Sequence, residues 1–152
     1  MDVAEMRDRV AAARVGRLAT VSANGGPHLV PFCFALLDDV VVTAVDHKPK
    51  RSTSLKRIEN IAATGRACVL VDEWSEDWAQ LWWVRLDCAA SVVEDSASRD
   101  RALAALTAKY AQYAATPPTG TVLALTVTRW TGWAASSGSA SHVSPEGSVY
   151  RV

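Results

Sequence analysis

Five basic side chains gather in one short stretch of the sequence, and their surroundings favour the binding of an anion. Hydroxyl side chains occupy residues 52–54 of this stretch, at the expected start of a helix. A helix start leaves backbone N–H groups free and carries the positive end of the helix dipole, so these groups can converge on a phosphate or carboxylate. The basic residues are Lys48, Lys50, Arg51, Lys56 and Arg57.

The charge of the whole chain limits what this anion can be. Lys plus Arg and Asp plus Glu each number 16, so no net charge draws the protein to nucleic acid or to an anionic membrane. The basic stretch also lacks aromatic residues, which nucleic-acid binders usually interleave with their basic ones. We therefore expect a small anionic ligand, with no nucleic acid and no membrane as partner. The alternative is an ordinary solvated helix start.

No pattern in the sequence predicts a catalytic group of side chains. His28 follows a turn and His47 lies in the basic stretch, but no carboxylate is spaced to orient either ring, so structural roles stay open for both. The serines lie outside nucleophile-elbow contexts, and no Rossmann or Walker-type glycine pattern occurs. The acidic cluster at 72–77 has no neighbouring His or Cys, so we expect no metal site. What remains favours a cofactor that carries its own redox chemistry.

Six tryptophans are many for a chain of 152 residues. Trp82 and Trp83 are adjacent on one expected strand and must point to opposite faces, so we expect one to face the core and the other a partner or a ligand. Trp130 and Trp133, near the end of the last strand, are candidates to flank a planar ring. A place in the core or at a dimer interface is the alternative for all of them.

Hydrophobic periodicity predicts a mainly β chain of six antiparallel strands, with flanking helices and one helical crossover. Asp2 and Glu5 have the spacing of a capping box, and Asn24-Gly25 favours a tight hairpin. Residues 40–45 are nearly continuous in β-branched side chains, which is typical of a strand buried on both faces. We expect a small barrel, with helices at 2–14, 55–62 and 96–114 and strands at 17–22, 27–36, 40–45, 66–73, 80–94 and 121–130.

Length and composition indicate one domain with a substantial core. We expect this domain over residues 1–134, followed by a Ser/Gly-rich tail over 135–152 that adds little core. Cys33, Cys68 and Cys88 lie in apolar runs without the close pairing of metal sites, so we interpret them as reduced thiols of a cytoplasmic protein. The apolar runs do not predict secretion or membrane insertion.

The order of several short motifs resembles the pyridoxamine-phosphate-oxidase-like split β-barrel flavoproteins. The most specific combination is Asp-x-Lys-Pro-Lys at 46–50 with Trp-Trp-Val-Arg at 82–85. Within this class the sequence is most similar to the actinobacterial branch that uses the deazaflavin coenzyme F420. Further matching motifs are Arg-Leu-Ala-Thr at 17–20, Gly-Pro-His-Leu-Val-Pro-x-x-Phe at 26–34, Thr-Ala-Val at 43–45 and Arg-Trp-x-Gly-Trp at 129–133.

This resemblance implies a homodimeric six-stranded split barrel with two cofactor sites at the interface, each completed by the second protomer. Residues 31–34 and 43–44 would approach the isoalloxazine-like ring, and the basic stretch would hold the phosphate and the glutamyl tail of F420 through charge-assisted contacts. Trp82, Trp83 and Trp130 are candidates for a wall supplied by the partner. The implied cofactor-binding residues are Pro31, Phe32, Cys33, Phe34, Thr43, Ala44, Lys48, Lys50, Arg51 and Trp82.

The expected function is hydride transfer between reduced F420 and a small electrophilic organic molecule, with no catalytic side chain required. His28 is an alternative to solvent as the source of a proton. Two other functions stay open: an FMN-binding oxidoreductase of the same class, and a non-catalytic protein that stores, delivers or senses a flavin. The chain lacks the C-terminal arginine-bearing segment of true pyridoxamine-phosphate oxidases, so vitamin B6 oxidation is not expected.

Overall fold

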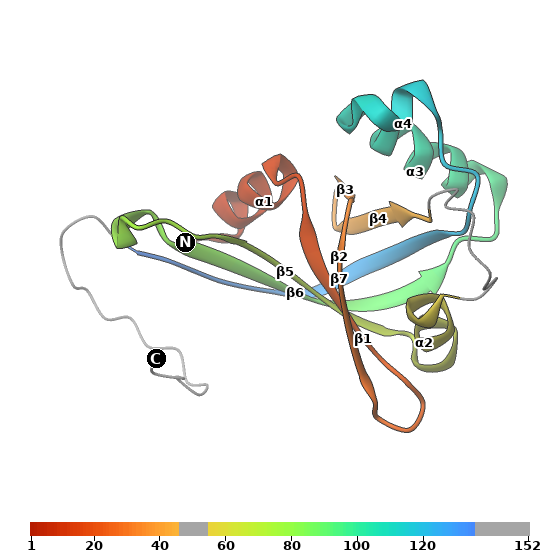
Figure 1. Cartoon of the computed structure of the whole chain (residues 1–152), viewed down its shortest axis with the longest axis horizontal. Coiled ribbons are helices and arrows are strands. Elements are labelled where there is room, and N and C mark those ends of the chain that lie inside the picture. Colours follow the sequence, from red (N-terminus) through yellow and green to blue (C-terminus); the bar gives the residue numbers. More distant parts are fainter. Residues whose placement is uncertain (46–54, 136–152) are drawn as a thin grey trace.

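A computed structural model of the protein describes residues 1–45 and 55–135. Within these residues, seven antiparallel strands form one curved sheet in the order β2-β1-β5-β6-β7-β4-β3 (Figure 1). The strands are β1 (Gly16–Val21), β2 (Pro27–Phe32), β3 (Ala35–Leu37), β4 (Val40–Ala44), β5 (Arg66–Glu73), β6 (Trp82–Val92) and β7 (Val122–Ala134). The helices are α1 (Val3–Ala12), α2 (Lys56–Thr64), α3 (Ser96–Lys109), α4 (Ala111–Ala115) and the short 3-10 helix η1 (Trp78–Gln80).

Local sequence signals account for several element ends. The carboxylate of Asp2 accepts a hydrogen bond of 2.9 Å from the backbone N–H of Glu5, which confirms the predicted N-cap of α1. The turn between β1 and β2 places Gly25 at φ 87°, as the Asn-Gly pair predicts. The predicted burial of β4 on both faces is also confirmed, because Val41 and Val42 point to opposite sides and are 0% and 4% exposed.

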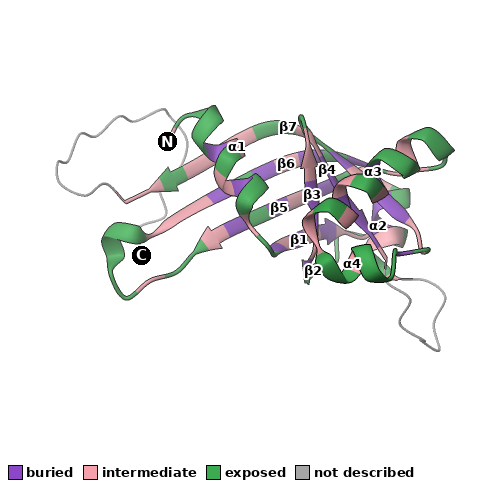
Figure 2. Ribbon diagram, turned by 90° about the horizontal axis from the view of Figure 1, so that it is seen from above, coloured by how far each residue is buried: buried purple, intermediate pink, exposed green. Residues whose placement is uncertain are grey.

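The sheet carries hydrophobic cores on both of its faces. The larger core lies on the concave side, where Met6 and Val10 of α1 and Ile61 of α2 cover the inward side chains of the long strands. The smaller core lies on the other side of β4 and β7, where Ala102 and Leu106 of α3 cover it. Along β5 and β6, buried positions alternate with more exposed ones, as expected for strands covered on one face (Figure 2).

Strands β5, β6 and β7 extend beyond the curved part of the sheet as a long arm that ends near η1 (Figure 1). Helix α1 lies close against β7 at Gly132, where a Cβ atom would come within 2.7 Å of the sulfur of Met6. The arm therefore packs against α1 on one face. Its other face is not covered by any helix that the structure describes.

The predicted fold class, mainly β with antiparallel strands and flanking helices, is confirmed. The strands number seven rather than six, because the predicted strand at 27–36 breaks at Cys33 and Phe34 into β2 and β3. The predicted helix at 96–114 also breaks, at Tyr110, into α3 and α4. Within the described residues, β2 and β3 are the two edge strands of the sheet and do not pair with each other. The sheet is thus a curled half-barrel, consistent with a split barrel.

Two predicted segments lie outside the described residues. They are residues 46–54, which hold three of the five basic residues, and residues 136–152 of the tail, so the predicted boundary between domain and tail stays a prediction. Helix α2 begins at Lys56 with Leu55 as its N-cap, and the predicted hydroxyl residues precede it in sequence. None of the helices that the structure describes is long and apolar enough to span a lipid bilayer.

Candidate functional site

Cys33 and Phe34 form the break between β2 and β3. Side chains from two other parts of the chain hydrogen-bond to the backbone of these residues. Thr43 of β4 donates its hydroxyl to the carbonyl oxygen of Cys33 at 2.8 Å. The hydroxyl of Tyr110, between α3 and α4, accepts from the backbone N–H of Phe34 at 3.1 Å. These bonds satisfy backbone groups that the interrupted sheet leaves without strand partners. We call residues 33 and 34 the β2–β3 junction.

Around this junction, alternate side chains face the core and the surface. Phe32 and Phe34 are buried, and their rings stack with centroids 5.3 Å apart. Gly16 permits this packing, since a Cβ atom there would lie 3.0 Å from the Phe32 ring and 3.1 Å from the Phe34 ring. Pro31 is exposed and Cys33 is half-buried. Of the predicted ring-contacting strand, Pro31 and Cys33 therefore present the accessible side chains.

The predicted residues on β4 are close to this surface but differ in what they expose. Thr43 and Ala44 are 6% and 7% exposed, and the Thr43 hydroxyl already donates to Cys33. In the protomer, these two residues therefore support the β2–β3 junction from beneath. The junction brings Cys33, Phe34 and Thr43 together as the sequence analysis expects, although a direct contact with a ring stays a prediction.

Two cations that the sequence analysis did not single out lie beside the junction. The Nζ atom of Lys109, the last residue of α3, lies 4.3 Å from the centroid of the Phe34 ring, and the guanidinium of Arg14 lies 4.9 Å from that of Tyr110. Lys109 Nζ is buried and has no hydrogen-bond partner in the part of the chain that the structure describes. Among the described residues, no carboxylate lies within ion-pair distance of either cation. Within residues 1–45 and 55–135, the junction therefore carries positive charge without a counterion.

Burial and charge shift the acidities of the groups at the junction. Burial, followed by the nearby charge of Arg14, lowers the pKa of Lys109 to about 8, while Cys33 acts weakly in the opposite direction. Burial raises the pKa of Tyr110 above its ordinary value. Both shifts favour the neutral form of the group, which indicates that the junction is poorly hydrated. In such surroundings the attraction between an anionic group and a nearby cation is stronger than in water.

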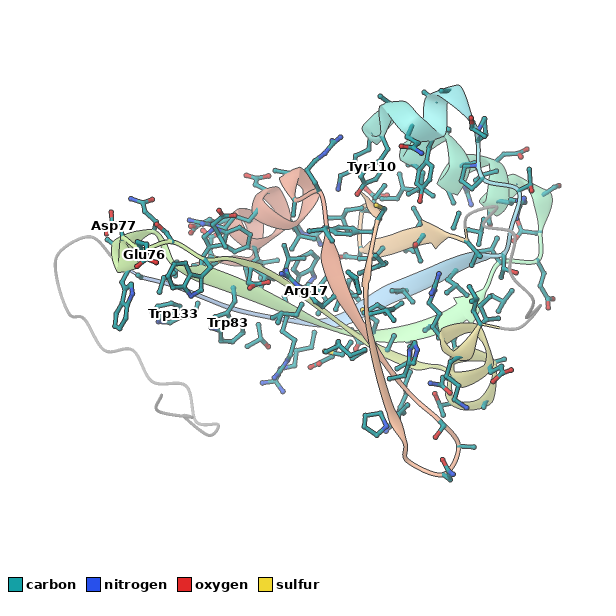
Figure 3. All side chains as sticks on the ribbon, in the orientation of Figure 1. Arg17, Glu76, Asp77, Trp83, Tyr110 and Trp133 are labelled. Carbon is teal, nitrogen blue, oxygen red and sulfur yellow. The ribbon has the colours of Figure 1, made fainter. Side chains whose placement is uncertain are left out.

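The tryptophans that were predicted to flank a ring lie on two opposite faces of the arm. Trp82 lies on the concave side and packs against the core, with the guanidinium of Arg9 5.0 Å from its ring centroid. Trp83 faces the opposite side, where it is the cross-strand partner of Trp133 (Figure 3). The prediction that the two adjacent tryptophans face opposite sides is confirmed. Trp82 lies beneath α1 and away from Thr43, so within one protomer it does not line the β2–β3 junction.

The uncovered face of the arm is a second notable surface. Arg17 pairs with Leu70 and Leu70 with Arg85 across β1, β5 and β6, and the row continues to Thr131 on β7. Leu70 is exposed, and the Oγ1 atom of Thr131 is buried without a hydrogen-bond partner. This face combines exposed apolar groups with an unsatisfied polar atom, as an incomplete interface would.

The remaining predicted residues are three residues of the basic stretch and His28. Lys48, Lys50 and Arg51 lie outside the described residues, so their proposed contact with an anion stays a prediction. His28 pairs with Thr20 near the start of β2, whereas the junction follows the end of that strand. The protomer thus separates His28 from the junction, and its role as a proton source also stays a prediction.

Residues 3–134 match the family described as pyridoxamine 5'-phosphate oxidase. The chain belongs to this family, which the sequence analysis expected from its motifs. No curated protein matches the sequence at a significant level.

Solved structures share the fold at low sequence identity. A conserved hypothetical protein from Mycobacterium tuberculosis is 22% identical, with a TM-score of 0.72 over 97% of this chain and 94% of that one. A FAD-binding protein from Mesorhizobium loti is 24% identical, with a TM-score of 0.66 over 87% and 92%. The heme storage protein HutZ from Vibrio cholerae is 16% identical, with a TM-score of 0.65 over 87% and 91%. At these identities the likeness shows the fold alone.

Proposed function

We propose that the protein binds the deazaflavin F420 and transfers a hydride between the reduced cofactor and a small electrophilic organic molecule. One observation carries the proposal: the half-buried Cys33 lies at a junction whose Phe34 and Tyr110 rings contact Lys109 and Arg14, cations without a carboxylate partner among the described residues. A flavin-type cofactor combines a planar ring with anionic groups. The apolar surface suits the ring, and the neighbouring cations suit the anionic groups.

The residues present fit such a cofactor on chemical grounds. Lys109 Nζ is a buried donor without an acceptor, and anionic oxygens are the acceptors that an ammonium prefers. Pro31 and Cys33 offer a surface without charge for one side of a ring. Lys48, Lys50 and Arg51 of the basic stretch would add a second set of donors for the phosphate and glutamyl tail.

When bound, the cofactor supplies the hydride chemistry through its ring. The side chains of this chain bind, orient and exclude water. Thr43 donates to the carbonyl of Cys33 and Tyr110 accepts from the N–H of Phe34, so hydrogen bonds hold the backbone of the edge that would face the ring. The stacked rings of Phe32 and Phe34 form an apolar floor that lowers the local dielectric.

The same proposal includes a homodimer in which the second protomer completes each site. The uncovered face of the arm supports it, because this face carries Leu70 and Trp133 at the surface and the unsatisfied hydroxyl of Thr131. A partner that covers this face would bury the apolar groups and supply an acceptor. In the dimer, Trp82 and Trp83 are candidates for the wall that one protomer lends to the other.

An ordinary flavin, FMN or FAD, is the second candidate cofactor. A FAD-binding protein from Mesorhizobium loti and another from Mycobacterium smegmatis share the fold, and this supports an isoalloxazine ring over its deaza analogue. A non-catalytic binding protein is the third candidate. The heme storage protein and a heme-binding protein from Mycobacterium smegmatis have this fold too, so the scaffold also occurs in proteins named for binding.

Titration of the protein with F420 and with FMN, followed by quenching of tryptophan fluorescence, separates these candidates. We expect saturable binding of F420 at lower concentration than FMN, and turnover of quinones, enones or imines by the loaded protein. A preference for FMN would replace the proposed cofactor. Tight binding without turnover of any of the three substrate classes would support the binding protein instead.

Alkylation of the cysteines locates the site independently of activity. We expect bound cofactor to protect Cys33, which is half-buried at the junction. Cys88 provides an internal reference, because burial raises the pKa of its thiol to about 12 and makes it slow to react in either state. Equal alkylation of Cys33 with and without cofactor would place the ring elsewhere.

A further inference from the structure

Arg14 and Lys109 converge on one aromatic ring from different parts of the chain. Arg14 lies between α1 and β1, and Lys109 ends α3. Their charged groups lie 4.9 Å and 5.5 Å from the centroid of the Tyr110 ring. The Tyr110 hydroxyl lies 2.9 Å from the carbonyl oxygen of Arg14, at the backbone from which the guanidinium extends, and its single proton is available to this carbonyl or to that of Phe34. Two like charges are thus held near each other at the β2–β3 junction.

A purely structural role does not account for this arrangement. Contact of the Lys109 ammonium with the Phe34 ring and its position at the C-terminus of α3 both stabilise the charge. Neither contact provides a hydrogen-bond acceptor, and the Nζ atom has none. Arg14 adds repulsion, since the two cations share no carboxylate among the described residues. An oxyanion between them would supply the missing acceptor and counter-charge together.

We propose that Arg14 and Lys109 form a second anion-binding site, separate from the basic stretch, that holds a carboxylate or similar oxyanion of the small substrate. This inference rests on the proposed function, because the junction is where the ring is expected. Arg14 is exposed and would meet the anion first, and the end of the Lys109 side chain would turn toward it. The substrate class would then be electrophiles that carry an anionic group.

The groups that face Lys109 make this site measurable. They are Arg14, the thiol of Cys33 and the hydroxyl of Tyr110. Burial and Arg14 together hold the pKa of Lys109 at about 8. A bound oxyanion opposes both effects, and one opposite charge at close range raises an amine's pKa by about one unit or more.

Competitive acetylation with acetic anhydride, read by mass spectrometry of peptides, tests the inference without any assay of turnover. At pH 8 the neutral fraction of Lys109 would fall from about one half to about one tenth on binding an anion, so acetylation should slow about fivefold. Inorganic phosphate is the probe, compared with chloride at equal ionic strength. We expect phosphate to protect Lys109, and we expect Arg14→Gln to abolish this protection.

Two results would overturn the inference. One is an acetylation rate of Lys109 that is the same in phosphate and in chloride. The other is equal protection in wild type and Arg14→Gln, since the site requires both cations. An unrelated lysine-containing peptide added to every sample is the reference for changes in reagent or salt.

A second arm separates the substrate anion from the cofactor's own anionic groups. F420 is added first, and phosphate is then titrated into the loaded protein. Protection of Lys109 by phosphate in the presence of F420 supports a substrate site. Full protection by F420 alone, with no further effect of phosphate, would assign these cations to the cofactor and overturn the inference. Acetylation of Lys48 and Lys50 in the same samples reports whether F420 binds the basic stretch, so failure of the proposed function is seen separately.

Discussion

The backbone N–H of Phe34 donates to the hydroxyl of Tyr110 at 3.1 Å, and that hydroxyl in turn lies 2.9 Å from the carbonyl oxygen of the same Phe34. The same hydroxyl also lies 2.9 Å from the carbonyl oxygen of Arg14, so one side chain at the end of α3 accepts from Phe34 and offers its single proton to one of two carbonyls. The consequence is that α3, although far from the arm, determines the shape of the candidate site. Figure 3 shows Tyr110 at this position between the helices and β3.

Replacement of Tyr110 by Phe should destabilise the protein by about 1–3 kcal/mol, because the N–H of Phe34 loses its acceptor and the carbonyls of Phe34 and Arg14 lose their shared donor while the ring is kept. Urea unfolding followed by circular dichroism measures the change. Tyr110→Leu should cost more, since it also removes the ring contacts with Tyr113 and the two cations. Wild-type stability of Tyr110→Phe would show that water replaces the hydroxyl without loss.

The stability of the wild-type protein relative to Lys109→Met should depend on pH. The folded-state pKa of Lys109, about 8, lies below its ordinary value of 10.5, so between these values the unfolded chain binds more protons and stability rises with pH. We expect Lys109→Met to be the more stable variant below pH 8, and the difference to shrink toward pH 10. Lys109→Gln should show the same trend. A difference that is constant with pH would contradict the buried-ammonium interpretation.

The raised pKa of Cys88 acts with the opposite sign and must be separated from this effect. Its thiol, at about 12 in the folded state against 9.0, lowers stability as pH rises above 9 because the unfolded chain ionises first. Cys88 is present in wild type and in both Lys109 variants. Its contribution therefore cancels in the comparison.

Neutralising Lys48 and Lys50 together should weaken F420 binding at least tenfold, because each charge-assisted hydrogen bond contributes about 1.5–3 kcal/mol. The salt dependence of the affinity should also become flatter. Fluorescence titration at several salt concentrations measures both quantities. Arg101→Ala is the control, since Arg101 is an exposed cation on α3 outside the basic stretch. Unchanged affinity in the double variant would mean that the basic stretch is an ordinary solvated surface.

Trp83→Glu should convert the proposed dimer into a monomer without unfolding it. Trp83 faces the uncovered side of the arm opposite Trp133, so a charge there would be buried on association and have no partner. Light scattering after size-exclusion chromatography gives the mass, and circular dichroism confirms the fold. Ala108→Glu, at an exposed position on α3, is the control. A dimeric Trp83→Glu variant would exclude this face as the interface.

Much of the fold could be predicted because its signals are local. The capping of α1 by Asp2, the turn at Gly25 and the burial of β4 each depend on a few neighbouring residues, and all were confirmed. The break at Cys33 could not be predicted in this way. The segment from 27 to 36 is continuously suited to a strand, and it breaks because Tyr110 and Thr43, distant in sequence, take over its backbone hydrogen bonds.

Only the part of the candidate site that has a local sequence signal could be predicted. The motif around residues 31–34 marks the junction, but which of its side chains are accessible depends on the Phe32 and Phe34 packing against Gly16. Lys109 gave no signal in the sequence beyond an ordinary basic residue at a helix end. Its environment, an aromatic ring and a second cation without a carboxylate, exists only once α3 has packed against the junction.

The pairing of β4 with β7, in which Val42 lies opposite Ala124, sets an order for assembly of the protein. Hairpins such as β1–β2 and β5–β6 join strands that are neighbours in sequence, so they can form early. The pairing of β4 with β7 can form only after β7, near the end of the described chain, is available. Thr43 lies on β4, and its hydrogen bond to Cys33 completes the junction. A ribosome-bound chain that ends before β7 can therefore have most of the sheet but not the site, so ligand binding by truncated chains would report the last step of folding.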